Sequence, residues 1–259
     1  FRRFGKDHIE HLAEEVHRKD LDVPEEIIAG LAQMGCFGLS IPEEYGGSAS
    51  GSIKDMYGMV IATEELSRAS LSIGGSLITR PEILARAIEN GGTDEQKRTL
   101  LPKIASGDLM SAVAVTEPDH GSDVASIAMS ARPEPSGGWK LNGVKTWCTF
   151  AGRADLLMVL ARTNPDTSQG HRGLSVFVVE KERADGHSFD FQQESGGRMQ
   201  GKAIPTLGYR GMHSFEIAFQ DWVVPEDSLI GGIEGEGQGF YLQMAGFENG
   251  RLQTAARAV

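Results

Sequence analysis

The chain has 259 residues, of which 40% are hydrophobic and 24% are charged, and its formal net charge at pH 7 is −11. These fractions are typical of a soluble globular protein and exclude a fibrous or disordered chain. Because an acidic surface repels polyanions, we do not expect nucleic acid as a partner.

Cysteine usage and apolar runs indicate where the protein works. The two cysteines, Cys36 and Cys148, are too few for a disulfide framework, and sparse cysteines are typical of a reducing compartment. No secretory signal pattern opens the sequence, and no stretch approaches the roughly 18 consecutive apolar residues of a membrane helix. We therefore expect a cytoplasmic protein with no membrane partner.

Residues 1–109 carry helical signals throughout. Asp22, followed by proline and two acids, is a plausible N-cap for a helix that Gly35 ends. Helical patterns return over residues 53–68 and 76–89, and Thr93 with Gln96 predicts a capping box for the next helix. The sequence therefore predicts an all-helical N-terminal domain.

From residue 110 to residue 231 the pattern changes to short β-type runs separated by turns. The runs span residues 111–116, 127–132, 139–141, 144–149, 156–161, 174–180 and 215–219. Asn142-Gly143 between two runs predicts a hairpin with a type I′ turn. Because no helix separates the strands, we expect an antiparallel barrel or sandwich as the middle domain.

Residues 232–259 return to helical composition after a glycine-rich link. The run Gly235 to Gly239 follows no long strand, so it does not predict a dinucleotide-binding unit. The helix from Phe240 to Val259 has no evident partner helix, and a lone helix cannot bury its apolar face. We therefore expect this segment to begin a truncated C-terminal helical domain that continues beyond Val259, in an α+β multidomain protein.

The segment from Val113 to Asp123, VAVTEPDHGSD, is the most informative. A strand ends at Thr116, Glu-Pro enforces an extended turn, and the backbone N–H groups near Gly121 and Ser122 can face an acceptor. On these residues alone, a structural turn and a site for an anion or heterocycle both remain open. The sequence lacks His-Glu-x-x-His, Cys-x-x-Cys, Gly-x-Ser-x-Gly and Walker patterns, so we expect no metal site.

This segment resembles the Thr-Glu-Pro…Gly-Ser-Asp signature of the acyl-CoA dehydrogenases. Residues 145–149 (KTWCT) resemble the family's second flavin segment, and residues 207–211 through 224–231 resemble its closing β-segment. Residues 39–47 and 96–107 resemble its helical domain. The resemblance spans nearly the whole chain, in order and at the family's spacing.

The resemblance implies FAD as cofactor and a set of residues that contact it. These residues are Val113, Val115, Thr116, Gly121, Ser122, Trp147, Cys148 and Thr149. An aromatic neighbour suits the flat flavin ring, and hydroxyl and amide donors suit its polar edge. Cys148 stands where many relatives have isoleucine, and the implied contact there is mainly through backbone. On its own, Trp147 would equally suit a barrel core.

On the substrate side, the resemblance implies Ser122, Glu248 and Arg251, although the last two alone would equally be a surface ion pair. The family places its catalytic glutamate at one of two positions. One of them is Gly250 here, so the base is expected downstream of Val259, with no catalytic residue in this chain and no activity of the chain alone.

The sequences of three segments are most similar to those of relatives that convert (2S)-methylsuccinyl-CoA to mesaconyl-CoA. These segments are residues 196–199, 209–213 and 247–257. Such a substrate carries a free carboxylate at the blind end of the pocket, which needs a cation or several donors when buried. Arg80 is the predicted partner of that carboxylate, with a surface or ion-paired arginine as the alternative.

The resemblance also implies partners and leaves alternative functions open. An electron-transfer flavoprotein is the implied electron acceptor, and a homotetramer or homodimer the implied assembly. The same fold also serves acyl-CoA oxidases and flavin monooxygenases, and a nucleic-acid-associated relative is an alternative of another class. The acidic charge balance already disfavours the last of these.

Overall fold

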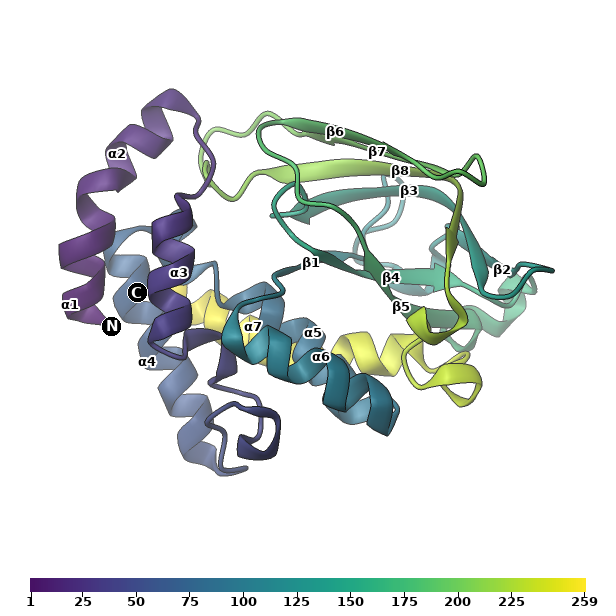
Figure 1. Ribbon diagram of the computed structural model, residues 1–259, viewed down its shortest axis with the longest axis horizontal. Coiled ribbons are helices and arrows are strands. Elements are labelled where there is room, and N and C mark those ends of the chain that lie inside the picture. Colours follow the sequence, from purple (N-terminus) through teal and green to yellow (C-terminus); the bar gives the residue numbers. More distant parts are fainter.

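The computed structural model describes residues 1–259. Its helices are α1 (Arg2–Phe4), α2 (Glu10–Lys19), α3 (Glu25–Gln33), α4 (Ile53–Ala69), α5 (Thr79–Gly91), α6 (Asp94–Ser106) and α7 (Gly239–Arg257). Its strands are β1 (Ser111–Ala114), β2 (Ser130–Pro133), β3 (Trp139–Thr149), β4 (Leu156–Arg162), β5 (Leu174–Glu180), β6 (Ser188–Gln192), β7 (Arg198–Ala203) and β8 (Ser214–Val224). Figure 1 shows the helices gathered beside and below a β-structure of two layers.

Local capping explains where the longer helices begin. The capping box predicted at α6 is confirmed, since Gln96 N–H donates to Thr93 Oγ1 and the Thr93 N–H donates back to Gln96 Oε1. The Gln96 amide also donates to the carbonyls of Asp227 and Leu229, which fixes the segment after β8 onto α6. The N-cap predicted at Asp22 is wrong, because α3 begins after Pro24.

The eight strands form one sheet in the order β1-β4-β2-β3-β8-β7-β6, with β5 paired to β4. The sheet curls so that β3, β8, β7 and β6 lie above β1, β4 and β5 (Figure 1). The predicted helical and β-rich parts of the fold are therefore confirmed. The sheet is not wholly antiparallel, because β1 pairs with β4 in parallel register.

The hairpin predicted at Asn142-Gly143 is wrong. Both residues lie inside the continuous strand β3, where the pairing with β8 shifts register between Leu141 and Gly143. Gly143 has a φ of 147°, and the Asn142 side chain accepts a hydrogen bond from the backbone N–H of Asp221 at 2.9 Å. A β-bulge uses the same conformational freedom as a tight turn, so the dipeptide alone does not separate them.

Strands β6 and β7 were not predicted because their sequences are short and largely polar. Phe189 of β6 nevertheless packs over Gly201 of β7, and a side chain at position 201 would lie 2.2 Å from the Phe189 ring. The glycine therefore serves cross-strand packing that its own sequence does not reveal.

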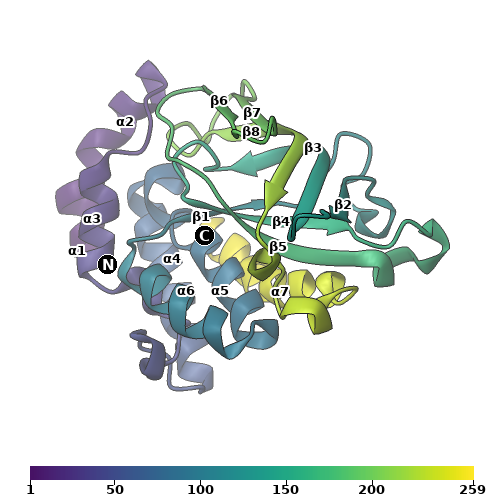
Figure 2. The ribbon, with the colours of Figure 1, turned by 45° about the vertical axis from the view of Figure 1, so that its right-hand side comes forward.

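Strands β4 and β5 are buried on both faces, which explains their continuous apolar sequences. One face of β4 contributes Leu157 and Val159 to the core between the two β-layers. The opposite face contributes Met158 and Leu160 to a second core beneath the helices. Figure 2 shows α5, α6 and α7 covering that second face. Alternate residues of one strand therefore serve two cores.

Helix α7 packs against α4 and α5 of the helical part, so the prediction that it has no partner helix is wrong. Its small residues allow this close approach, since a side chain at Gly246 would lie 2.8 Å from the Ile83 carbonyl oxygen. No helix combines the length and apolar character needed to cross a bilayer.

Candidate functional site

A cavity of about 230 Å³ lies where α5, α7, β1 and β3 meet. It is lined by Thr79, Arg80, Ile83, Val113, Val115, Thr116, Thr146, Trp147, Thr149, Phe247, Gly250, Arg251, Thr254 and Arg257. The β-domain supplies an aromatic ring and three threonines, and the helices supply three arginines. No carboxylate lines the cavity.

Trp147 is turned outward by an irregularity in β3. The pairing with β8 shifts register between Lys145 and Cys148, and Trp147 has a φ of 56°. This left-handed conformation is unfavourable for a side chain of that size. As a result, 57% of the Trp147 surface is exposed, although its neighbours in β3 are buried. Strained residues of this kind cluster at ligand sites.

The two motif segments are tied together directly. The Thr146 N–H donates to the Thr116 carbonyl at 2.8 Å, which places the ends of both segments side by side. The Thr149 hydroxyl is 2.8 Å from the Ser214 hydroxyl, so its orientation is fixed from β8. The cavity wall formed by Thr116, Trp147 and Thr149 is therefore held by hydrogen bonds beneath it.

A buried ion pair supports this wall. Lys145 Nζ donates to Glu117 Oε1 and to the Val115 carbonyl, both at 2.9 Å. Glu117 also accepts from the N–H groups of Ala128 at 2.7 Å and Met129 at 2.8 Å. Burial acts to raise the pKa of Glu117, but Lys145 and the two backbone donors outweigh burial and lower it. Both charged residues stand in the motifs, but their pairing was not predicted.

The opposite wall is cationic. Arg80, Arg251 and Arg257 line the cavity, and none of them has a carboxylate within ion-pairing distance. Arg80 and Arg257 both donate to the Tyr209 hydroxyl oxygen, at 3.2 and 3.1 Å. Arg257 also donates to the Ser76 hydroxyl at 3.1 Å. Arg80 and Arg257 are partly buried, whereas Arg251 is exposed. Guanidinium groups without a carboxylate partner are suited to an anionic ligand.

The charge of these arginines acts on Tyr209. Burial acts to raise the pKa of the Tyr209 hydroxyl, but the positive charges of Arg80 and Arg257 outweigh burial and lower the pKa. The Tyr209 hydroxyl also donates to Ser76. The group therefore links the loop before β8 to α5 and α7.

The face of α7 toward the cavity follows from helical spacing. Phe247, Gly250, Arg251, Thr254 and Arg257 recur at intervals of three or four residues, which places them on one side of a helix. This periodicity was the signal that could have revealed Arg257 and Thr254 in the sequence. Thr79, Ile83 and Thr146 also line the cavity without having been predicted, and they carried no such signal.

The structure brings most of the predicted site residues together. Those that line the cavity are Val113, Val115, Thr116, Trp147, Thr149, Arg80 and Arg251. Those that do not are Gly121, Ser122, Cys148 and Glu248.

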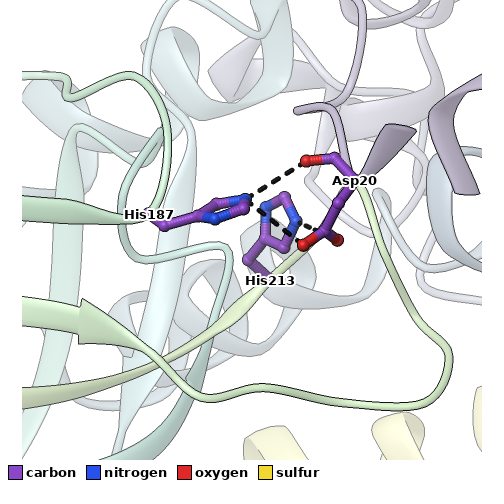
Figure 3. Close-up of side chains that lie close together, drawn as sticks. All are labelled: Asp20, His187 and His213. Carbon is purple, nitrogen blue, oxygen red and sulfur yellow. Dashed lines mark hydrogen bonds and ion pairs between the residues drawn. The ribbon is translucent and has the colours of Figure 1, made fainter. Parts of the chain in front are cut away.

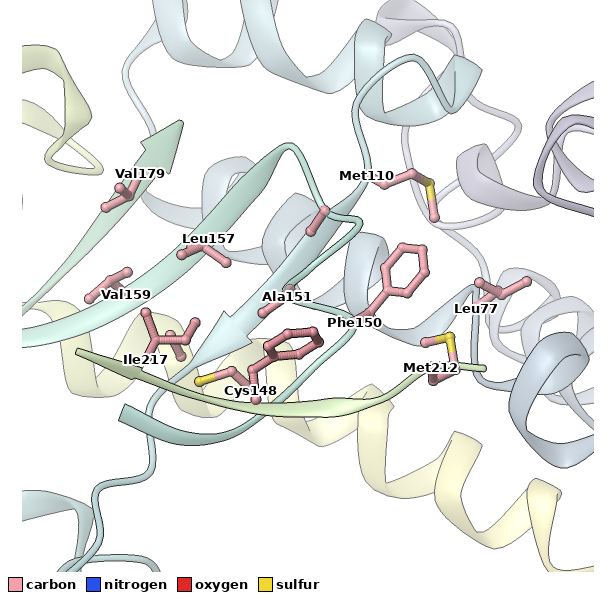
Figure 4. Close-up of a cluster of buried hydrophobic side chains, with 14 of the residues drawn as sticks. Leu77, Met110, Cys148, Phe150, Ala151, Leu157, Val159, Val179, Met212 and Ile217 are labelled. Carbon is pink, nitrogen blue, oxygen red and sulfur yellow. The ribbon is translucent and has the colours of Figure 1, made fainter. Parts of the chain in front are cut away.

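The four residues outside the cavity lie in two kinds of place. Gly121 and Ser122 are exposed on the loop after β1, and Glu248 is exposed on α7. Cys148 lies in the hydrophobic core with Phe150 and Ile217 (Figure 4). Burial raises the pKa of the Cys148 thiol to about 12. Any contact of Cys148 with a ligand in the cavity must come from its backbone.

The wall formed by Thr116, Trp147 and Thr149 (the β-wall) fits a flavin. Trp147 offers an exposed flat surface, and Thr116 and Thr149 offer hydroxyl groups beside it. A planar apolar ring with a polar edge matches this combination. The wall is also free of unpaired charge, since Lys145 is bound to Glu117 behind it.

Comparison with known proteins shows the family of the chain. Residues 1–108 match the family model "Acyl-CoA dehydrogenase, N-terminal domain", and residues 112–222 match "Acyl-CoA dehydrogenase, middle domain". The (2S)-methylsuccinyl-CoA dehydrogenase of Cereibacter sphaeroides is 43% identical over 260 residues, which cover 100% of this chain and 45% of that protein.

Two solved structures share the fold over nearly the whole chain. A glutaryl-coenzyme A dehydrogenase in complex with glutaryl-CoA aligns with a TM-score of 0.85 and 28% identity over 99% of this chain and 60% of the other. A structure described as the electron transferring flavoprotein of Acidaminococcus fermentans aligns with a TM-score of 0.84 and 29% identity over 99% and 62%. The chain thus spans about half to two thirds of these relatives, and it belongs to the acyl-CoA dehydrogenase family of FAD-binding flavoprotein oxidoreductases.

Proposed function

We propose that the protein containing this chain dehydrogenates (2S)-methylsuccinyl-CoA to mesaconyl-CoA with FAD as cofactor. The observation that carries this proposal is the cavity itself, in which Trp147 and the threonines face three arginines that have no carboxylate partner. The 43% identity to a methylsuccinyl-CoA dehydrogenase supports the same substrate.

In this proposal the β-wall holds the cofactor, and the opposite wall, with Arg80, Arg251 and Arg257, holds the substrate. FAD, when bound, supplies the acceptor for the hydride that leaves the β-carbon. Trp147 would lie against the ring, and the hydroxyl groups of Thr116 and Thr149 would bind its polar edge. Arg80 and Arg257 would pair with the free carboxylate of the substrate, whose burial requires such donors. Arg251 faces the same space.

The base that removes the α-proton is proposed to lie outside these 259 residues. No carboxylate lines the cavity, and Gly250 offers no side chain where the family has one of its two glutamate positions. Glu248 is exposed and lies about 200° around the helix from position 250, at 100° per residue. We therefore assign Glu248 no part in proton removal.

We further propose an electron-transfer flavoprotein as electron acceptor and a homotetramer or homodimer as the assembly. A solved structure whose description names an electron transferring flavoprotein contains a chain that aligns with this one, which supports the first of these. Direct reduction of the flavoprotein by the substrate-reduced enzyme would test it.

The substrate proposal is tested by comparing acyl-CoA esters on the full-length protein. We expect kcat/KM for (2S)-methylsuccinyl-CoA to exceed the values for butyryl-CoA and isovaleryl-CoA. Because a hydrogen bond to a charged group contributes about 1.5 to 3 kcal/mol, Arg80→Met and Arg257→Met should each lower kcat/KM for methylsuccinyl-CoA roughly 10- to 100-fold. The same variants should change kcat/KM far less for isovaleryl-CoA, whose acyl group has no carboxylate.

Arg98→Met is the matched control, since Arg98 lies on α6 and pairs with Glu95 at the surface. This substitution should leave kcat/KM unchanged for both methylsuccinyl-CoA and isovaleryl-CoA. If butyryl-CoA or isovaleryl-CoA reacts far faster than methylsuccinyl-CoA, the substrate assignment is wrong. If Arg80→Met and Arg257→Met lower kcat/KM equally for methylsuccinyl-CoA and isovaleryl-CoA, these arginines do not bind the carboxylate of the substrate.

A further inference from the structure

A second cluster of chemically active side chains lies away from the cavity, where the helical part meets the β-domain. Asp20 follows α2, His187 precedes β6 and His213 precedes β8 (Figure 3). The three residues come from segments far apart in the sequence. Their potential metal-ligating atoms nevertheless all lie within 4.8 Å of one another.

The spacing of these atoms is close to that of a metal site. His213 Nε2 lies 3.2 Å from Asp20 Oδ1, and His187 Nε2 lies 3.8 Å from Asp20 Oδ2. Ligands in a tetrahedral zinc site, with bonds of about 2.0 to 2.1 Å, lie roughly 3.3 Å apart. One edge therefore already has this length. His187 Nε2 also lies 3.2 Å from the Asp20 carbonyl oxygen, and its exposed side chain has to turn away from that contact to bind a metal.

His213 lies between two carboxylates that precede α3. Its Nδ1 lies 3.1 Å from Asp22 Oδ1, and its Nε2 lies 3.2 Å from Asp20 Oδ1. Each ring nitrogen therefore has one carboxylate beside it, and Nε2 is the nitrogen that faces the cluster.

Asp22 is placed as the outer partner of a metal-binding histidine. Its Oδ2 accepts from the Gly186 N–H at 2.6 Å, and its Oδ1 binds His213 Nδ1. Metal-bound histidines commonly donate their other ring N–H to a carboxylate, which fixes the ring and makes the ligating nitrogen more basic. This role also explains why Asp22 does not cap α3.

The backbone has a positive φ at two of the three residues, and at Asp20 this is the left-handed C-cap that ends α2. Asp20 has a φ of 55° and His213 a φ of 27°, and neither is glycine. His213 is also 94% buried, since its relative exposure is 6%. Residues held in such conformations persist where the surroundings fix them, as at ligand clamps.

We propose that Asp20, His187 and His213 bind a divalent first-row transition metal of the Zn²⁺ type, with Asp22 orienting His213. Imidazole nitrogens with one carboxylate suit zinc and exclude magnesium and calcium, which prefer oxygen ligands. Arg210 Nε lies 3.4 Å from Asp20 Oδ1, the oxygen beside His213 Nε2, and so helps to orient this carboxylate. The bound ion would connect the end of α2 with the loops before β6 and β8.

The test uses the full-length protein without a histidine tag, stripped with a chelator and titrated with ZnCl₂ in a calorimeter at pH 7.5. We expect one Zn²⁺ per chain, a raised Tm in the presence of Zn²⁺, and no binding of Mg²⁺. His187→Ala removes an exposed ligand without disturbing the core and should weaken Zn²⁺ binding at least 10-fold. His11→Ala, which removes an exposed histidine of α2 outside the cluster, is the matched control and should change nothing.

Asp22→Asn tests the outer partner and should weaken Zn²⁺ binding about 10- to 100-fold without changing the stoichiometry. The proposal is overturned if the wild-type chain binds Zn²⁺ no more tightly than His187→Ala. The cluster would then be a hydrogen-bonded contact between the helical part and the β-domain.

Discussion

Two buried glutamates, Glu82 of α5 and Glu117 after β1, show how differently two parts of one protein treat the same side chain. Their relative exposures are 1% and 7%. Glu82 accepts hydrogen bonds from the neutral amides of Asn249 and Gln253 on α7, at 2.9 and 3.2 Å. Glu117 is bound by a lysine and two backbone N–H groups.

The difference in partners sets the charge of each group. Burial raises the pKa of Glu82 to about 7, because its amide partners and the more distant Arg86 do not offset the loss of water. The pKa of Glu117 is lowered, because Lys145 and the backbone donors outweigh burial. Burial alone therefore does not fix the protonation state of a carboxyl group. The number and charge of its donors do.

The largest expected effect comes from breaking the charged pair. Glu117→Ala leaves Lys145 buried without its carboxylate, and removing one partner of a buried pair costs about 3 to 5 kcal/mol. The free energy of unfolding from urea denaturation at pH 7 measures this loss.

Glu134→Ala provides the contrast on the same domain. Glu134 pairs with Lys140 at 2.9 Å, but the pair is partly exposed and should contribute less than about 1 kcal/mol. Equal losses for Glu117→Ala and Glu134→Ala would show that burial of the Lys145 pair has no special weight.

An intermediate effect of opposite sign is expected at Glu82. Its folded-state pKa of about 7 lies above the ordinary value of 4.5, so its stabilising contribution is complete below about pH 4.5 and is lost as pH rises through 7. Glu82→Gln should therefore stabilise the protein by about 2 to 3 kcal/mol at pH 8 and by less than about 1 kcal/mol at pH 5. Urea denaturation at both pH values measures the difference.

The pH dependence of stability also distinguishes Glu82 from Glu117. The pKa of Glu117 is lowered, so its contribution is present at neutral pH and is lost as pH falls through the folded-state pKa. A stabilisation by Glu82→Gln that does not change with pH would mean that Glu82 is ionised in the folded state, as Glu117 is.

The smallest effect is expected at Arg86. Its Nε lies 3.9 Å from Glu82 Oε1, and its charge lowers the pKa of Glu82. Arg86 is also partly exposed, so Arg86→Gln should destabilise the protein by less than about 1 kcal/mol at pH 8 and still less at pH 5. A loss as large as that of Glu117→Ala would show that Arg86 neutralises Glu82 as Lys145 neutralises Glu117.

Local patterns predicted the parts of the fold that depend on neighbouring residues. The capping box of Thr93 and Gln96 and the apolar run of β4 needed no distant partner to be recognised. Asn142-Gly143 was misread, because β8 converts a turn-forming dipeptide into a bulge. Strands β6 and β7 were missed, because their packing depends on contacts between strands.

In the candidate site, too, the sequence identified the residues whose surroundings are local and did not identify those that depend on distant segments. The motifs identified Thr116 and Trp147, whose surroundings are set by short segments. They did not identify Arg257 or Tyr209, whose meeting requires α7, α5 and the loop before β8 to converge. The Glu117–Lys145 pair was likewise hidden, since it joins residues 28 positions apart. Pairing across such distances is decided by the fold.

The left-handed backbone of Trp147 has a consequence for how this protein can change. Glycine would relieve a conformational cost of about 1 to 2 kcal/mol at that position, but it would also remove the ring that faces the cavity. Folding and ligand binding therefore favour different residues there. A library ranked by thermal stability alone would enrich variants without the ring, so engineering of this chain has to score binding and stability separately.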